Sequence, residues 1–174
     1  MSARVLVAGV GNIFLGHDGF GVEVAARLAR MSVPDGVEVV DFGIRSVHLA
    51  YQLLDGYDTL VLVDAVRRGD EPGTLSVIEP ELEDTAADEG PLAVDAHGMD
   101  PTSVLQMVSG LGGRVERVLV VACEAERLVD EIGLSEPVTR AIPAAVDLVM
   151  GLLDDISSAH VEVGSGAGRP ALRQ

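Results

Sequence analysis

Short apolar runs rich in valine alternate along the chain with segments whose apolar residues recur at helical spacing. We expect strands at residues 4–10, 37–42, 58–66, 74–78 and 117–122. We expect helices from Asp18 to Pro34 and at residues 45–54, 97–113 and 134–153. This alternation predicts an α/β fold, a three-layer α/β/α sandwich around a mostly parallel twisted sheet of about five strands. Residues 58–66 are almost wholly apolar, so we expect that strand near the centre of the sheet.

The length of the chain, 174 residues, suits one domain with a sizeable core. We expect a single domain over residues 1–155 and a disordered tail over residues 156–174. No apolar run is long enough for a transmembrane helix. The single cysteine, Cys123, ends an apolar run and predicts a small buried side chain, not a nucleophile; it allows no internal disulfide. We therefore expect a cytoplasmic protein, and a monomer because nothing in the pattern demands more.

Acidic residues outnumber basic ones, 28 to 12, which gives a formal net charge of −16. This charge repels nucleic acid and anionic membrane surfaces, so we expect neither as a partner. A metal ion or a basic polypeptide segment would be attracted. Solubility alone is the other reading of the charge.

The first loop, in VLVAGVGNIFLGHDGFG, resembles a nucleotide-binding turn that has lost its third glycine. Gly9 and Gly11 allow a tight turn after the first strand, but Phe14 stands at the third glycine position. Asp18 lies where the helix begins, and a carboxylate there repels phosphate. The loop therefore presents an acid and does not cradle a phosphate.

Polar side chains lie at the carboxyl ends of the expected strands, where ligands bind in open α/β sheets. Asp18 follows the first strand, Asp41 ends the second and Asp64 ends the third, while His97 precedes a later helix. An ionised Asp64 within LVLVDAV costs several kcal/mol unless a partner neutralises it. Two carboxylates and an imidazole suit a divalent transition metal, so these residues predict a metal site.

Each residue also has a structural reading. Asp18 can cap the following helix, and Asp64 can accept hydrogen bonds from nearby loop amides. Asp41 can anchor the turn that follows it. His97 can be a helix cap or an ordinary surface histidine.

The segments GVGNIFLGHDGFG, LVLVDAV, DAHGMD and IGLSEPV resemble, in order and spacing, the maturation endopeptidases of nickel–iron hydrogenases. The resemblance runs from about residue 4 to residue 153. It implies a cytoplasmic α/β endopeptidase that removes a short C-terminal extension from a hydrogenase large-subunit precursor. It further implies that the enzyme acts after nickel insertion and recognises the nickel, which the precursor carries.

The resemblance places the family's three metal-contacting positions on Asp18, Asp64 and His97. It places on Asp41 an aspartate for which an essential role has been suggested, and these acids are the candidate catalytic residues. Asp41 is the candidate to position or deprotonate a water. The metal is the candidate to polarise the scissile carbonyl.

The chain departs from the family pattern at three places. His17 replaces a common acid, Ala125 replaces a common proline, and residues 42–45 read Phe-Gly-Ile-Arg where Gly-Gly-Thr is common after the aspartate. Two alternative functions stay open for this sequence.

One is a dinucleotide-binding oxidoreductase, supported by Gly9-x-Gly11 and by Asp41 at the position of a ribose-binding acid. The other is a chaperone that binds nickel or the precursor without cutting it.

Overall fold

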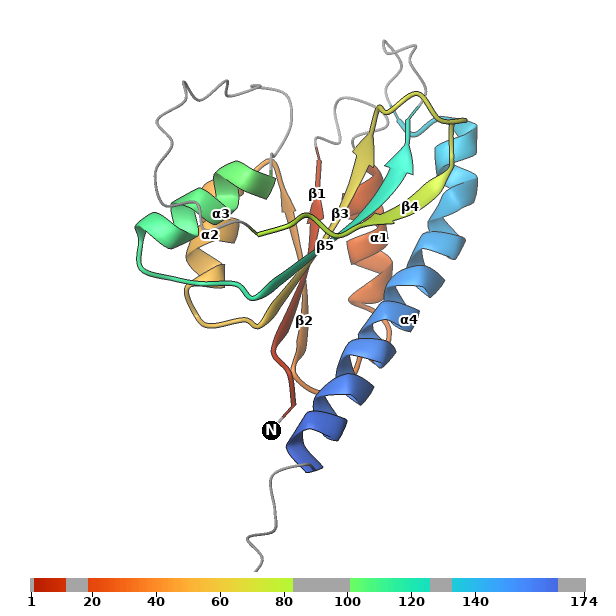
Figure 1. The fold of residues 1–174 in the computed structure, drawn as a ribbon. Helices are drawn as coiled ribbons and strands as arrows, with labels where there is room; N and C mark the ends of the chain where they lie inside the picture. The colour runs from red at the N-terminus through yellow and green to blue at the C-terminus, as the bar shows by residue number, and fades with distance from the viewer. Residues whose placement is uncertain (1, 12–18, 83–100, 126–132, 166–174) are drawn as a thin grey trace, which may run out of the picture.

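A computed structural model describes residues 2–11, 19–82, 101–125 and 133–165 (Figure 1). Its sheet has five strands in the order β2-β1-β3-β5-β4. The strands are β1 (Val5–Val10), β2 (Val37–Gly43), β3 (Thr59–Val66), β4 (Leu75–Ile78) and β5 (Arg117–Glu124). Pairings among β2, β1, β3 and β5 are parallel, and β4 pairs antiparallel with β5. The predicted, mostly parallel sheet is confirmed, and the apolar strand β3 lies at its centre.

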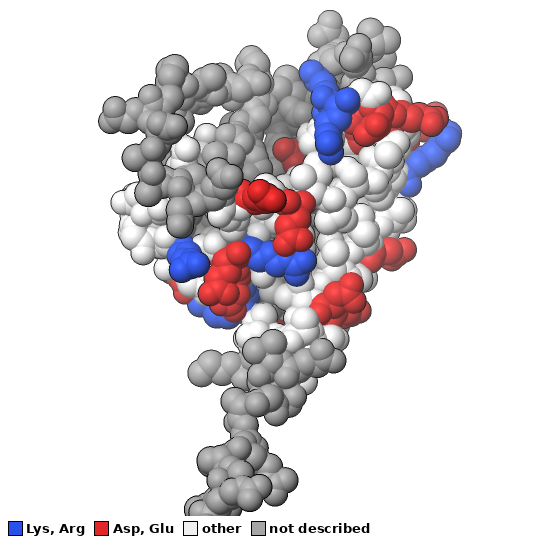
Figure 2. Space-filling view, in the orientation of Figure 1, with Lys and Arg blue, Asp and Glu red and all other residues white. Residues whose placement is uncertain are grey.

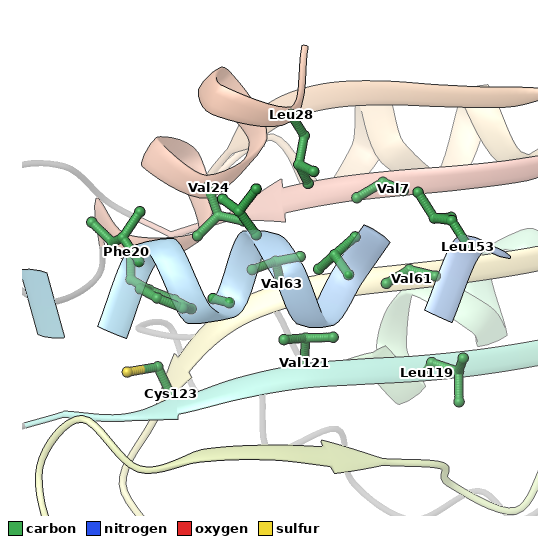
Figure 3. Packing of buried hydrophobic residues seen from close by; sticks show 14 of the residues in the cluster. Val7, Phe20, Val24, Leu28, Val61, Val63, Leu119, Val121, Cys123 and Leu153 are labelled. Carbon is green, nitrogen blue, oxygen red and sulfur yellow. The ribbon is translucent and has the colours of Figure 1, made fainter. Parts of the chain in front are cut away.

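Two helical layers cover the sheet, one on each face (Figure 1). The helices are α1 (Phe20–Leu28), α2 (Ser46–Leu53), α3 (Pro101–Gly110) and α4 (Glu136–Ser165). Alternate strand residues point to opposite faces, so the strands supply two separate cores. One core joins α1 and α4 to the sheet and includes Phe20, Val63 and Leu153 (Figure 3). The other joins α2 and α3 to the opposite face. The three-layer sandwich predicted from the sequence is therefore confirmed.

The connection from β3 to β4 crosses the end of a strand that comes later in the sequence. β4 pairs with β5 and not with β3, so residues 67–74 must pass over the carboxyl end of β5. Glu124, the last residue of β5, meets this connection through its main chain. Its amide donates to the Thr74 carbonyl at 2.9 Å, and its carbonyl accepts from the Gly73 amide at 2.8 Å. The connection is thereby fastened to β5.

Helix α1 packs against the strands at the distance of backbone contact. A Cβ atom on Gly9 would lie 2.3 Å from the Gly21 carbonyl oxygen and 2.6 Å from the Ala25 Cβ. Gly9 therefore has a packing role, because only a residue without a side chain fits beneath α1.

Several element boundaries differ from those expected. The N-cap position of α1 is Gly19 and not Asp18, and it makes no side-chain capping hydrogen bond. Ser135 directly precedes α4, and its carbonyl accepts from the Thr139 amide at 2.9 Å. Helix α4 continues to Ser165, past residue 155, where the sequence places the end of the domain. The division into a domain and a disordered tail stays a prediction, since residues 166–174 lie outside the described part. Within the described ranges, no helix has the length and apolar character needed to span a membrane.

Candidate functional site

The structure describes two of the four predicted site residues. Asp41 lies in β2 and Asp64 in β3, each near the carboxyl end of its strand. Asp18 and His97 lie outside the described residues. In the sequence, Asp18 directly precedes Gly19 and α1, and His97 shortly precedes α3. The proposed convergence of all four residues therefore stays a prediction.

Asp64 is a half-buried carboxylate that follows the fully buried part of β3. Its Oδ1 accepts a hydrogen bond from the Ala65 amide at 2.8 Å. Parallel pairing with Ala122 of β5 holds its backbone. Leu62, two residues earlier, belongs to the core under α2 and α3, so strand alternation places Asp64 on that face.

Asp41 lies at an irregularity in the edge strand β2. Gly9 of β1 pairs with Asp41, but the next residue, Val10, pairs with Gly43, so Phe42 is an extra residue on β2. Such bulges re-aim neighbouring side chains and are common next to active sites. The Phe42 side chain is buried, whereas Asp41 is exposed. The bulge thus ends β2 with an anchored aromatic ring beside an accessible carboxylate.

Arg45 closes the turn after Asp41. Its Nη2 donates to the Asp41 carbonyl at 2.6 Å, and its Nε donates to the Phe42 carbonyl at 3.0 Å. Both bonds go to main-chain oxygens, so Arg45 fixes the backbone on which the Asp41 carboxylate is carried. The sequence did not assign Arg45 a role. The structure gives it this one.

Strand β1 separates Asp41 from Asp64. Two inter-strand spacings amount to roughly 10 Å. Val39 packs against the core under α1 and α4, so alternation places Asp41 on the face opposite Asp64. The structure brings the two acids to the same end of the sheet, where the parallel strands have their carboxyl ends, but does not bring them into contact. Among the described residues, no three histidine, cysteine, aspartate or glutamate side chains are placed to hold a metal together.

Glu124 is an acid of this edge that the sequence analysis missed. Its side chain is 4 % exposed. Its Oε1 accepts from the amides of Arg68 and Gly69, both at 2.9 Å. The only sequence signal was an acid directly after the apolar run that includes Cys123.

Cys123 is fully buried, as expected. Burial, with a smaller contribution from the Glu124 charge, raises the pKa of its thiol to about 11. A thiol with this pKa is not a nucleophile near neutral pH.

Charged side chains of both signs are interspersed over the face drawn in Figure 2. The Arg117 Nε lies 2.7 Å from the Glu79 Oε1, and the Arg27 Nε lies 3.3 Å from the Glu23 Oε1. These exposed pairs contribute little to stability. The face shows no broad basic surface, in keeping with the acidic composition.

Comparisons with known proteins agree on one family. A family model described as hydrogenase maturation protease matches residues 22–152. The hydrogenase expression/formation protein HupD of Rhizobium leguminosarum is 32% identical over 171 residues, covering 97% of this chain and 83% of that protein. The hydrogenase 2 maturation protease of Escherichia coli is 30% identical over 156 residues, covering 86% of this chain and 90% of that protein. Among solved structures, the hydrogenase maturating endopeptidase HybD of Escherichia coli superposes with a TM-score of 0.69 at 28% identity, covering 87% of this chain and 93% of that one.

Proposed function

The chain belongs to the hydrogenase maturation protease family, and on this basis we propose that it removes the C-terminal extension of a nickel–iron hydrogenase large-subunit precursor after nickel insertion. As a member of this family it is a hydrolase, an endopeptidase. The observation that carries the proposal is Asp64, a half-buried carboxylate at the carboxyl end of the central strand β3. Carboxylates suit divalent transition metals, and the carboxyl end of a parallel strand is where ligands bind in open α/β sheets, so Asp64 is placed to contact a metal ion that the substrate carries.

The nickel belongs to the substrate in this proposal. Asp64 contacts it together with Asp18 and His97, whose assignments rest on the resemblance. Two carboxylates and one imidazole suit a divalent transition metal without holding it tightly. A weak site of this kind distinguishes the loaded precursor from the empty one, because only the loaded precursor gains the additional contact.

Asp41 acts on the water that attacks the scissile bond. The strand spacing that separates it from Asp64 leaves room for a peptide segment across the end of β1. A peptide anchored through its metal near Asp64 would then present its backbone toward the exposed Asp41 carboxylate. Asp41 would position or deprotonate the water there. A monomeric, cytoplasmic enzyme without nucleic-acid partners is expected from the sequence, and these points stay predictions.

The test is an incubation of the protein with its cognate precursor in nickel-loaded and nickel-free forms. Mass spectrometry reads the C-terminus of each product. We expect a short extension to be lost from the loaded form only. Cleavage of both forms would support protease activity and would show that the enzyme does not require nickel to recognise the precursor. Cleavage of neither would favour a protein that binds the precursor without cutting it.

A further inference from the structure

Glu124 is a buried carboxylate to which the proposed reaction gives no role. Burial of an unsatisfied carboxylate costs several kcal/mol, so the side chain needs strong hydrogen-bond donors. Its donors among the described residues are backbone amides of the β3–β4 connection. The Arg68 amide lies 2.9 Å from Oε1 and 3.1 Å from Oε2, and the Gly69 amide lies 2.9 Å from Oε1. Glu124 therefore fixes the backbone of the two residues at the start of this connection.

Main-chain bonds hold the same connection at both of its ends. The Ala125 amide donates to the Val66 carbonyl at 2.9 Å, directly before the connection begins. The Glu124 amide donates to the Thr74 carbonyl at 2.9 Å, where the connection ends. A glutamate is rarely fully buried unless its polar atoms are paired, and here backbone amides of this connection supply the pairing. The start of the connection is therefore held by the Glu124 carboxylate as well as by main-chain bonds.

Arg68 is one of the two residues whose backbone Glu124 fixes. It is exposed, and it lies four residues after Asp64 at the carboxyl end of β3. Among the described residues its guanidinium has no hydrogen-bond or ion-pair partner. Arg27, Arg117 and Arg140 differ, because each pairs with a glutamate. Arg68 therefore has a fixed backbone and an available charged group at the edge where the substrate is expected.

We propose that Arg68 binds a carboxylate of the precursor's C-terminal extension and that Glu124 is the positioning residue that holds Arg68 for this contact. The inference rests on the proposed function. A guanidinium binds a carboxylate through two parallel hydrogen bonds. A side chain whose backbone is already fixed loses less conformational freedom on binding.

The net charge of the protein opposes the approach of a carboxylate, so binding one requires a cationic group at short range. A chain with a net charge of −16 repels an acidic peptide end, and Asp41 and Asp64 lie at the same edge. Asp70 and Glu71 follow Arg68 in the turn, so the turn as a whole is not basic. Recognition therefore depends on the short-range geometry of Arg68 and not on a broad positive field.

The experiment measures steady-state processing of the nickel-loaded precursor by Arg68→Ala, Arg68→Lys and the control Arg114→Ala. Arg114 is also exposed, but it precedes β5 at the opposite end of the sheet. We expect Arg68→Ala to raise KM about tenfold with kcat nearly unchanged, because a charged hydrogen-bonded contact outside the reacting bond is lost. Arg68→Lys should recover part of the loss, and Arg114→Ala should match the wild type.

Two altered precursors identify the carboxylate. One has its terminal carboxylate amidated, and in the other the aspartates and glutamates of the extension are changed to their amides. The wild-type enzyme should show a raised KM for one of these two precursors. For that precursor, Arg68→Ala should have the same KM as the wild type, because the contact is already lost. Equal KM values for both altered precursors and the unaltered one would overturn the inference.

Glu124 is tested through Glu124→Leu, with Glu124→Gln as the variant that keeps an acceptor oxygen. At a temperature at which the variants are folded, Glu124→Leu should raise KM as Arg68→Ala does, while Glu124→Gln stays close to the wild type. Combination of Glu124→Leu with Arg68→Ala should add nothing further. A purely structural Glu124 would lower stability and leave KM unchanged. If Glu124→Leu does not fold, the Arg68 variants still decide the contact.

Binding of labelled precursor gives a readout that does not depend on cleavage. If the wild type binds but never cleaves, the proposed function fails, while a weaker Arg68→Ala complex still supports the contact. If the wild type cleaves and Arg68→Ala has the wild-type KM and Kd, the inference fails and the proposed function stands.

Discussion

A Cβ atom on Gly21 would lie 2.1 Å from the carbonyl oxygen of Val63, because the first turn of α1 packs directly on the backbone of β3. The same atom would lie 2.4 Å from the Val10 carbonyl oxygen of β1. Backbone on both sides cannot yield as a flexible side chain would. The contact brings the start of α1 against the residue that precedes Asp64 and so sets how close this helix lies to the edge of the site.

Gly21→Ala should therefore destabilise the protein, although alanine is the better helix former. We expect a loss of about 1–3 kcal/mol or more in the free energy of unfolding, the usual cost of forcing an extra methyl group into a packed interior. Gly151→Ala in α4 is the matched control, because a Cβ there meets nothing within 4 Å. It should be neutral or stabilising by up to about 1 kcal/mol. Urea unfolding of the three proteins measures both changes, and equal stability of Gly21→Ala and the wild type would contradict the packing argument.

The sequence predicted the fold because its apolar patterns follow the layers. The uninterrupted run in β3 predicted a strand buried on both faces, and β3 lies between β1 and β5. The sequence could not show that β4 pairs with β5 across the β3–β4 connection. That pairing depends on contacts between residues far apart in the chain, which a local pattern does not contain.

The site was predictable only in part. Asp41 and Asp64 follow from the rule that ligands bind beyond the carboxyl ends of parallel strands. Glu124 was missed because its partners, the amides of Arg68 and Gly69, lie more than fifty residues earlier in the chain. The expected strand ends at residue 122, whereas β5 continues through Glu124. The nucleotide-binding alternative relied on Gly9, whose missing side chain serves contact with α1.

Tyr57 is the centre of a polar cluster at the amino end of the sheet. Its buried hydroxyl donates to Glu38 and accepts from the Gln52 amide nitrogen at 3.2 Å. The Arg4 guanidinium lies 4.7 Å from the centre of its ring. Tyr57→Phe should lower the free energy of unfolding by about 1–3 kcal/mol, because polar groups of Glu38 and Gln52 lose a partner.

The pH dependence of this cluster has a definite sign. Burial, and after it the hydrogen bond to Glu38, raises the pKa of Tyr57 above its ordinary value of 10.0. The unfolded chain therefore ionises first, and the contribution of Tyr57 to stability is lost as the pH rises above 10.0. Denaturant titrations of the wild type and Tyr57→Phe at increasing alkaline pH should converge. A constant difference between them would contradict this assignment.

Cys123 provides a test of the core under α1 and α4, because it is the only cysteine in the chain. The thiol is fully buried and its pKa is raised from 9.0 to about 11. A thiol-specific colorimetric reagent at a pH of about 8 should react slowly with the native protein and at once with the denatured one. Stability should also fall as the pH rises from 9.0 to about 11, because the unfolded thiol ionises first. Cys123→Ala provides the blank, and rapid reaction of the native protein would show that this core is open.

Asp58 directly precedes β3, and Asp64 lies near the carboxyl end of that strand. Variants of the two residues therefore compare a structural aspartate with the one proposed to be functional. Asp58 precedes the strand, and its Oδ2 accepts from the Arg4 amide at 2.8 Å. Asp64→Asn keeps the size of the side chain and an oxygen that can accept from the Ala65 amide, but it removes the charge proposed to contact nickel. We expect processing of the loaded precursor to fall about a hundredfold or more, which corresponds to roughly 2.7 kcal/mol of lost transition-state stabilisation. Asp58→Asn should lower stability modestly and leave the rate per folded molecule at the wild-type value. Normal processing by Asp64→Asn would remove Asp64 from the site, and an equal loss in both variants would show that the effect arises from the strand and not from the charge at its carboxyl end.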